Sequence, residues 1–141
     1  MTVRSSEKSL LRVLDANYNR AKEALRVCED IARFYFSDRR LTAQFKRLRH
    51  DLTQALIELK IPDRHMVAVR NSKEDVGRSS LIHDKKNPGW KDIFISNLKR
   101  GEEASRVLEE FSKMIDTRKT PLFQKIRFRL YELEKVGIQK F

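Results

Sequence analysis

One polar pattern occurs twice in this chain, and it constrains the fold more than any other feature. Residues 17–30 read NYNRAKEALRVCED and residues 97–110 read NLKRGEEASRVLEE, so both contain N-x-x-R-x-x-E-A-x-R-V-x-E. The repetition extends further, because FKRLR at 45–49 is echoed by FQKIR at 123–127. The repeating unit is therefore a pair of segments, and the sequence predicts an approximate internal two-fold relation between two halves.

Apolar residues recur with a helical period in all four segments. In the first segment they fall within roughly a third of the helix circumference, at about 100° per residue. The spacing predicts an all-α fold in which residues 6–60 and 89–137 form two αα-hairpins, packed as a four-helix arrangement in one domain. Local signals for helix ends are Ser37 or Asp38, Pro62, Asn87-Pro88, Thr120-Pro121 and Gly137.

Composition narrows the class of protein. The single cysteine, Cys28, excludes an intramolecular disulfide and a zinc site built from several cysteines. No apolar run approaches the ~20 residues that span a bilayer, and the first residues lack the apolar core of a signal peptide. We therefore expect a cytoplasmic protein without a membrane partner. The net charge of +11 favours anionic ligands: nucleic acid, a membrane surface or small phosphorylated molecules.

The repeated polar residues are candidate ligand-binding groups. On a helical wheel Asn17 lies in the apolar stripe and Arg20 about 60° to one side, so both are predicted to face largely inward. The same spacing places Asn97 and Arg100 inward. Two interpretations remain open. The arginines pair across the pseudo-axis with carboxylates (Arg20 with Glu103, and Arg100 with Glu23), or they line a cleft that binds phosphate oxygens through guanidinium forks. Arg26 and Arg106 are predicted to lie on the solvated side.

The connector at residues 62–88 is polar and predicted to be irregular, with at most a short element. Its stretch RNSKEDVG, at 70–77, either closes over a bound ligand or is a solvated linker. The chain has neither a G-x-x-x-x-G-K-[ST] nor a G-x-G-x-x-G motif, so a bound nucleotide needs side chains and helix N-termini for its phosphates. It also has no recognised motif for binding DNA or RNA.

Five stretches in this order resemble a known family: RVLDANYNRAKEALRVCEDIARF, LRHDL, DVG, NLKRGEEASRVLEEF and IRFRLYELEK. The family is the alternative hydroxymethylpyrimidine-phosphate kinase of thiamin biosynthesis, a helical domain unrelated to the ribokinase-like enzyme. It is often fused in front of a thiamin-phosphate synthase barrel. The resemblance covers nearly the whole chain. This chain ends at Phe141, so we expect no barrel and no synthase activity. It also has Asn71 where the family tends to have aspartate.

The resemblance implies phosphoryl transfer from ATP to 4-amino-5-hydroxymethyl-2-methylpyrimidine phosphate, with Mg²⁺. Such chemistry needs mainly positioning and charge neutralisation. The substrate-binding candidates are Asn17, Arg20, Arg49, Arg70, Gly77, Asn97, Arg100 and Arg127. The candidates for catalysis and for holding Mg²⁺ are Glu23, Asp75 and Glu103.

Two other functions stay open at this stage. One is a non-enzymatic basic helical protein that binds nucleic acid, which we consider the less favoured reading. The other is a regulatory partner of a separate thiamin-phosphate synthase. A homodimer is compatible with each, and the sequence does not say whether the repeat makes one active site or two.

Overall fold

The computed structural model describes residues 3–78 and 87–141, and in these ranges it is helical without strands. This confirms the predicted all-α fold. The elements are α1 (Val3–Asp30), a π-helical turn η1 (Ile31–Tyr35), α2 (Arg39–Glu58), α3 (Asp63–Ala68), α4 (Trp90–Ser112) and α5 (Thr120–Ile138). Residues 79–86 of the predicted connector lie outside the described ranges.

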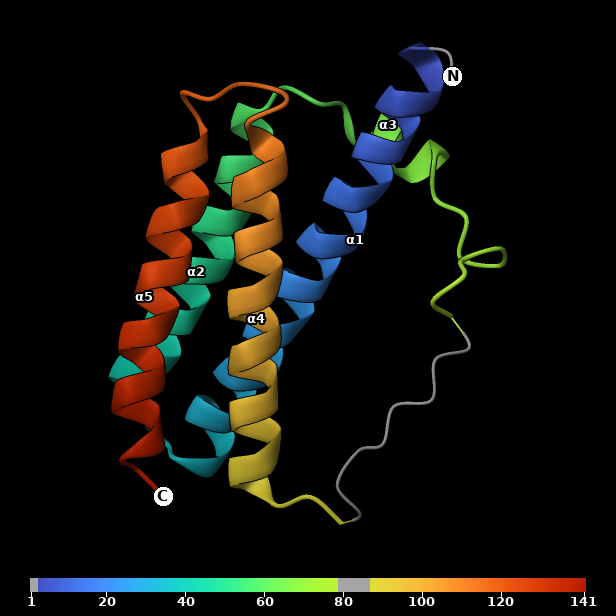
Figure 1. Ribbon diagram of the computed structural model, residues 1–141. Coiled ribbons are helices and arrows are strands. Elements are labelled where there is room, and N and C mark those ends of the chain that lie inside the picture. Colours follow the sequence, from blue (N-terminus) through green and yellow to red (C-terminus); the bar gives the residue numbers. More distant parts are fainter. Residues whose placement is uncertain (1–2, 79–86) are drawn as a thin grey trace.

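The four long helices form the two predicted hairpins. α1 packs on α2 and α4 packs on α5, while α1 also packs against α4 and α2 against α5. Figure 1 shows α2, α4 and α5 running side by side, with α1 inclined across them and its N-terminal half extending past the bundle. The short α3 lies beside that extending half of α1. The predicted rotation that superposes the hairpins stays a prediction.

The predicted cap at the start of α2 is confirmed, and two other predicted helix boundaries are corrected. Asp38 caps α2, since its carboxylate accepts the Leu41 N–H at 2.8 Å. The predicted start at Asn87-Pro88 is displaced, because α4 begins after Gly89, whose N–H donates to the Asp92 carboxylate at 2.9 Å. The Asp92 carboxylate, three residues after Gly89, therefore marks the start of α4 better than Pro88 does.

The second correction concerns Gly137, which does not stop α5. It lies inside the helix with an ordinary negative φ, and the helix continues to Ile138. A Cβ atom at this position would lie 2.4 Å from Cζ of Phe94, a fully buried ring. Gly137 is thus needed for close packing of α5 on α4, and the helix end is set elsewhere.

The core lies between the four long helices. Phe45 of α2, Phe94 of α4 and Phe123 of α5 are completely buried and are its largest members. Ala24 of α1 and Gly101 of α4 mark the close approach of these two helices, since a Cβ built on Gly101 would lie 3.8 Å from that of Ala24. Small residues at this contact let α1 and α4 approach closely.

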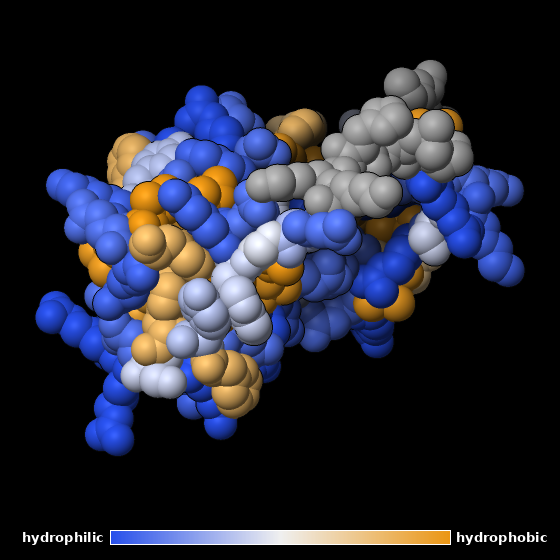
Figure 2. All heavy atoms as spheres, turned by 90° about the horizontal axis from the view of Figure 1, so that it is seen from below, coloured by the Kyte–Doolittle hydropathy of each residue, from blue (hydrophilic) through white to orange (hydrophobic). Residues whose placement is uncertain are grey.

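The lower end of the molecule in Figure 1 carries exposed aromatic rings. Trp90 stacks on Tyr35 with ring centroids 4.5 Å apart, and Phe141 packs against Phe36 at 4.9 Å. Figure 2 views this end from below and shows hydrophobic residues gathered among hydrophilic ones. Within the described ranges, no helix has the length and apolar character needed to cross a membrane.

Candidate functional site

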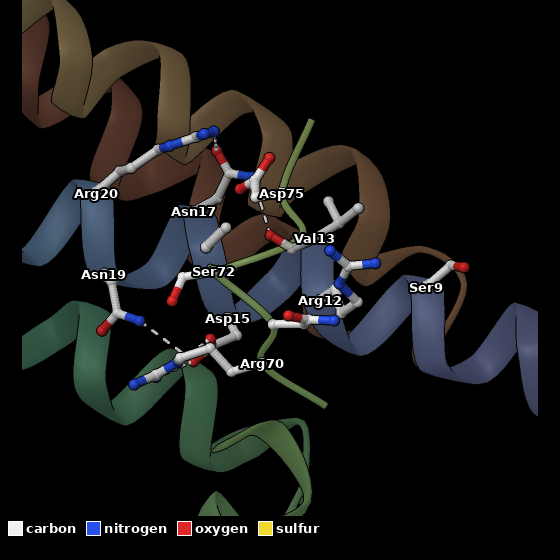
Figure 3. Close-up of a pocket in the computed structure, with 12 residues that line it drawn as sticks. Ser9, Arg12, Val13, Asp15, Asn17, Asn19, Arg20, Arg70, Ser72 and Asp75 are labelled. Atoms are coloured by element: carbon white, nitrogen blue, oxygen red, sulfur yellow. Dashed lines mark hydrogen bonds and ion pairs between the residues drawn. The ribbon is translucent and has the colours of Figure 1, made fainter. Parts of the chain in front are cut away.

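A pocket of about 510 Å³ lies along the N-terminal half of α1, against the connector. Its walls come from α1 and from the segment that follows α3, as Figure 3 shows. The lining residues are Ser9, Arg12, Val13, Asp15, Ala16, Asn17, Asn19, Arg20, Arg70, Asn71, Ser72 and Asp75. Four predicted site residues, Asn17, Arg20, Arg70 and Asp75, therefore meet at one place.

Asn17 is buried in the wall of this pocket, as its wheel position predicted. It is 5% exposed, and its amide donates to the Val13 carbonyl at 2.9 Å. Its side-chain oxygen faces Arg20, whose Nη1 lies 3.5 Å away. That distance is at the limit of a hydrogen bond, so the guanidinium remains available to a ligand.

The predicted inward orientation of Arg20 is wrong, and so is that of Arg100. Both residues are exposed. Each leaves its helix at the edge of the apolar stripe, and a long side chain at that position carries its charge outward to water. Neither of the two proposed ion pairs, Arg20 with Glu103 or Arg100 with Glu23, is among the salt bridges of the described residues.

Two arginines of the pocket have no carboxylate partner among the described residues: Arg20 and Arg12. The sequence reasoning missed Arg12. It lies eight positions before Arg20, with Ala16 between them at the i, i+4 spacing that places side chains along one side of a helix. That spacing within RVLDANYNR was the signal available. The pocket thus presents two free guanidinium groups beside a buried amide.

Arg70 lines the pocket and is held by a carboxylate of α1. Its Nε and Nη2 bond the two carboxylate oxygens of Asp15 at 2.8 and 2.7 Å, so its planar fork is already occupied. Asp15 is 7% exposed and also accepts from the Asn19 amide at 3.2 Å. The hydrogen bond that Arg70 donates to Asp15 raises the pKa of the Arg70 guanidinium. Sequence reasoning missed Asp15, because a contact 55 residues away leaves no local pattern.

Asp75 lines the pocket from the connector side. One of its oxygens, Oδ1, accepts the Gly77 N–H at 2.8 Å, and no other described residue bonds its second oxygen. In the view of Figure 3 the Asp75 carboxylate overlaps the Asn17 amide, and both residues line the pocket. Gly77 itself is exposed and is not a lining residue. Asp75 is thus the pocket carboxylate open to a cation, since Asp15 is neutralised by Arg70.

The remaining predicted residues lie outside this pocket. Glu23 and Glu103 are exposed on α1 and α4, and neither lines the pocket. Asn97 donates to the Ile93 carbonyl at 2.9 Å, just as Asn17 does to Val13, but Asn97 and Arg100 are not lining residues either. In the described part of the chain, no three His, Cys, Asp or Glu side chains are grouped in a way that holds a metal ion.

The predicted phosphate ligands Arg49 and Arg127 are each held by a buried glutamate. Arg49 donates to Glu29 at 2.9 and 3.4 Å, and Arg127 donates to Glu109 at 2.8 and 3.3 Å. Both glutamates are 4% exposed. They occupy the last position of the repeated pattern, which the sequence reasoning quoted but did not assign.

The outer arginines of the repeat complete these two groups. Arg26 lies 3.6 Å from Glu29 and Arg106 lies 3.3 Å from Glu109, with more than half of each arginine side chain exposed. Their predicted solvated position is confirmed. Each half of the molecule thus contains the same Arg–Glu–Arg group, joining the first helix of a hairpin to the second.

The second half also contains a buried acid pair. Burial and a hydrogen bond with Glu134 raise the pKa of Glu102 to about 7, while the same hydrogen bond lowers the pKa of Glu134. Lys99 lies 3.4 Å from Glu102 and 2.7 Å from Glu134. The Oε2 atom of Glu102 is buried without a hydrogen-bond partner. Burial and the acidic neighbour thus both favour the protonated form of Glu102.

Comparison with known proteins identifies the family. The profile of the ThiD2 family matches residues 12–136. This chain belongs to the ThiD2 family. Its relatives include thiamine-phosphate synthases of Thermosynechococcus vestitus (35% identical over 133 residues) and Synechocystis sp. (37% over 132 residues). These alignments cover 93% and 92% of this chain and 36% of each relative.

Another relative is the thiamine-phosphate synthase of Rhodopirellula baltica. It is 31% identical over 141 residues, which cover 95% of this chain and 37% of the relative. The chain therefore spans about a third of the length of the curated relatives it matches. No solved structure matches it. The family and its relatives show involvement in thiamin biosynthesis.

Proposed function

We propose that this ThiD2-family protein is a kinase that transfers a phosphoryl group from ATP to 4-amino-5-hydroxymethyl-2-methylpyrimidine phosphate, forming the diphosphate. The observation that carries the proposal is the pair of guanidinium groups, Arg12 and Arg20, that face a pocket of about 510 Å³ and have no carboxylate partner within residues 3–78 and 87–141. Both substrates are anionic. The pocket thus offers what a phosphoryl-transfer site needs most, fixed positive charge.

Each side chain has a role that follows from its position. Arg12 and Arg20 bind phosphate oxygens, and a guanidinium does so through two parallel hydrogen bonds. The Asn17 amide is fixed by its bond to Val13 and leaves its oxygen to orient Arg20 or the substrate. The nucleophile is an ionised phosphate oxygen, so the reaction needs no strong general base.

Asp75 is the residue that fits a magnesium ion. Mg²⁺ is usually held by one or two protein carboxylates together with substrate phosphates and water. Asp75 supplies one such carboxylate on the pocket wall, with one oxygen outside the bond to Gly77. When bound, the ion neutralises phosphate charge. The exposed Glu23 and Glu103 are less suitable ligands, since they lie outside the pocket.

The synthase reaction named for the relatives is not part of this proposal. The matched region is about a third of each relative, so the name describes a longer polypeptide. We place the kinase step in this region and propose that a thiamine-phosphate synthase, separate or fused, is its partner. Cytoplasmic location and a homodimer stay predictions.

The direct test is an assay of the purified protein with the pyrimidine monophosphate, ATP and Mg²⁺, with product separated by ion-exchange chromatography. We expect saturable, Mg²⁺-dependent formation of the pyrimidine diphosphate together with ADP. Absence of turnover, combined with tight binding of single- or double-stranded nucleic acid at physiological salt, would instead support the nucleic-acid-binding alternative.

A further inference from the structure

We infer that Asp15 is a positioning residue that fixes the connector wall of the pocket and thereby sets the place of Asp75. The inference rests on the proposed function, because it concerns the carboxylate that we assign to Mg²⁺. It also changes the role of Arg70, which becomes the connector's anchor on α1 and ceases to be a substrate ligand.

The contact between Asp15 and Arg70 has the geometry of a strong anchor. Two nearly parallel hydrogen bonds of 2.8 and 2.7 Å join one carboxylate to one guanidinium, which fixes orientation as well as distance. Asp15 is 7% exposed and is steadied by the Asn19 amide. Asp15, whose own side chain is fixed on α1, thus holds Arg70, which lies 55 positions later in the chain.

Among the described residues, the rest of the segment is held by local hydrogen bonds. Asn71 and Glu74 bond each other at 2.8 and 3.2 Å, and Asp75 bonds the Gly77 N–H at 2.8 Å. These bonds shape a turn but do not attach it to the helices. Between residues 69–78 and α1, the fork of Arg70 on Asp15 is the side-chain hydrogen bond that the described structure provides.

The position of Asp75 therefore depends on a contact five residues before it. With the fork intact, the turn at residues 71–77 stands over α1 and its carboxylate faces the pocket (Figure 3). Without the fork, the turn loses its register on α1, and its internal hydrogen bonds open more often. A catalytic group misplaced by about 1 Å costs about 100-fold in rate, so even a small displacement is measurable.

The experiment uses the full chain carrying Asp15→Asn, which is nearly isosteric but cannot neutralise Arg70. Hydrogen exchange of the amides of residues 71–78 is first measured without substrate. We expect it to become roughly tenfold faster, because the turn is released, while the amides of α4 are unchanged. Glu74→Gln is the control, since Glu74 belongs to the turn and bonds only Asn71 there. Unchanged exchange in Asp15→Asn would overturn the anchor.

The second arm measures catalysis. We expect the Mg²⁺ concentration for half-maximal rate to rise about tenfold in Asp15→Asn and to stay unchanged in Glu74→Gln. A structural role without positioning would lower the melting temperature and leave the Mg²⁺ requirement per folded molecule unchanged, and that result would overturn the inference. If the wild-type protein shows no turnover, the proposed function fails, whereas the exchange data still decide the anchor.

Arg70→Gln alone and combined with Asp15→Asn separates anchoring from direct binding. If Arg70 acts only through Asp15, the two single variants and the double variant all lose the same amount of kcat/KM. If Arg70 binds substrate directly, Arg70→Gln loses a further tenfold or more in kcat/KM beyond Asp15→Asn, and the reassignment of Arg70 would be wrong.

Discussion

The two halves of this protein carry the same polar pattern, but the structure completes it differently in each. Both halves hold an arginine of the second helix with a buried glutamate of the first, Arg49 with Glu29 and Arg127 with Glu109. Both also turn an asparagine amide back onto the carbonyl four residues earlier. These shared contacts are internal to each hairpin.

The halves differ where a third segment is needed. In the first half, residues 70–75 lie over α1 and form the pocket around Asn17 and Arg20. Asn97 and Arg100 are no part of that pocket, and their helix instead carries the buried Glu102 against Glu134. The repeat therefore encodes the same buried ion pairs twice, whereas the pocket depends on the connector that follows the first hairpin.

The largest expected effect is a loss of stability when the buried glutamate–arginine pair that both halves share is broken. Glu29→Ala and Glu109→Ala each leave a mostly buried arginine without its carboxylate, and we expect each to lower the free energy of unfolding by about 3 kcal/mol. Urea denaturation followed by circular dichroism measures it. Arg26→Ala and Arg106→Ala are the controls, and since both side chains are more than half exposed they should cost under about 1 kcal/mol. A large difference between the two glutamate variants would contradict structural equivalence of the halves.

The two halves should also differ in how their stability depends on pH, and this difference is expected to be smaller. Burial and the neighbouring Glu134 raise the pKa of Glu102 to about 7, so the folded state holds a proton that the unfolded chain releases at the ordinary glutamate pKa of 4.5. Its contribution to stability is therefore present below pH 4.5 and is lost as the pH rises through 7. We expect Glu102→Gln to be more stable than wild type at pH 8, by about 1–2 kcal/mol, because the proton belongs to a coupled pair.

Melting temperatures between pH 5 and pH 8 measure this difference. Lys22 occupies the equivalent position of the first half and is exposed, so Lys22→Gln should show the same pH dependence as wild type. If wild type and Glu102→Gln keep parallel stability curves across this range, Glu102 does not carry the proton.

The all-α fold, the two hairpins and the cap at Asp38 followed from the sequence, because helical periodicity and capping are local properties. The exact end of α5 did not, since Gly137 is required by the ring of Phe94 on another helix. Packing between distant residues leaves no trace in a local pattern, so the glycine was read as a helix stop.

The candidate site was only partly predictable, for the same physical reason. The sequence predicts Asn17, Arg20 and Asp75 as site residues, and all three line the pocket. It does not predict the partners of Arg49, Arg70 and Arg127, because a helical wheel shows which way a side chain leaves its helix but not which carboxylate it meets. Arg20 and Arg49 look equally suited to phosphate in the sequence. Only the structure shows that one is free and the other is occupied.

The central claim is that the first half alone forms the ligand site, and one pair of variants tests it most directly. Arg20→Lys keeps the charge but loses the planar fork, and we expect kcat/KM for the pyrimidine phosphate to fall roughly 10- to 100-fold, or about 1.5–3 kcal/mol. Arg100→Lys changes the equivalent residue of the second half, and we expect less than a twofold change. Both values are taken per folded molecule, with melting temperatures on the same preparations. Equal losses in the two variants would contradict the account, because they would mean that both halves bind substrate.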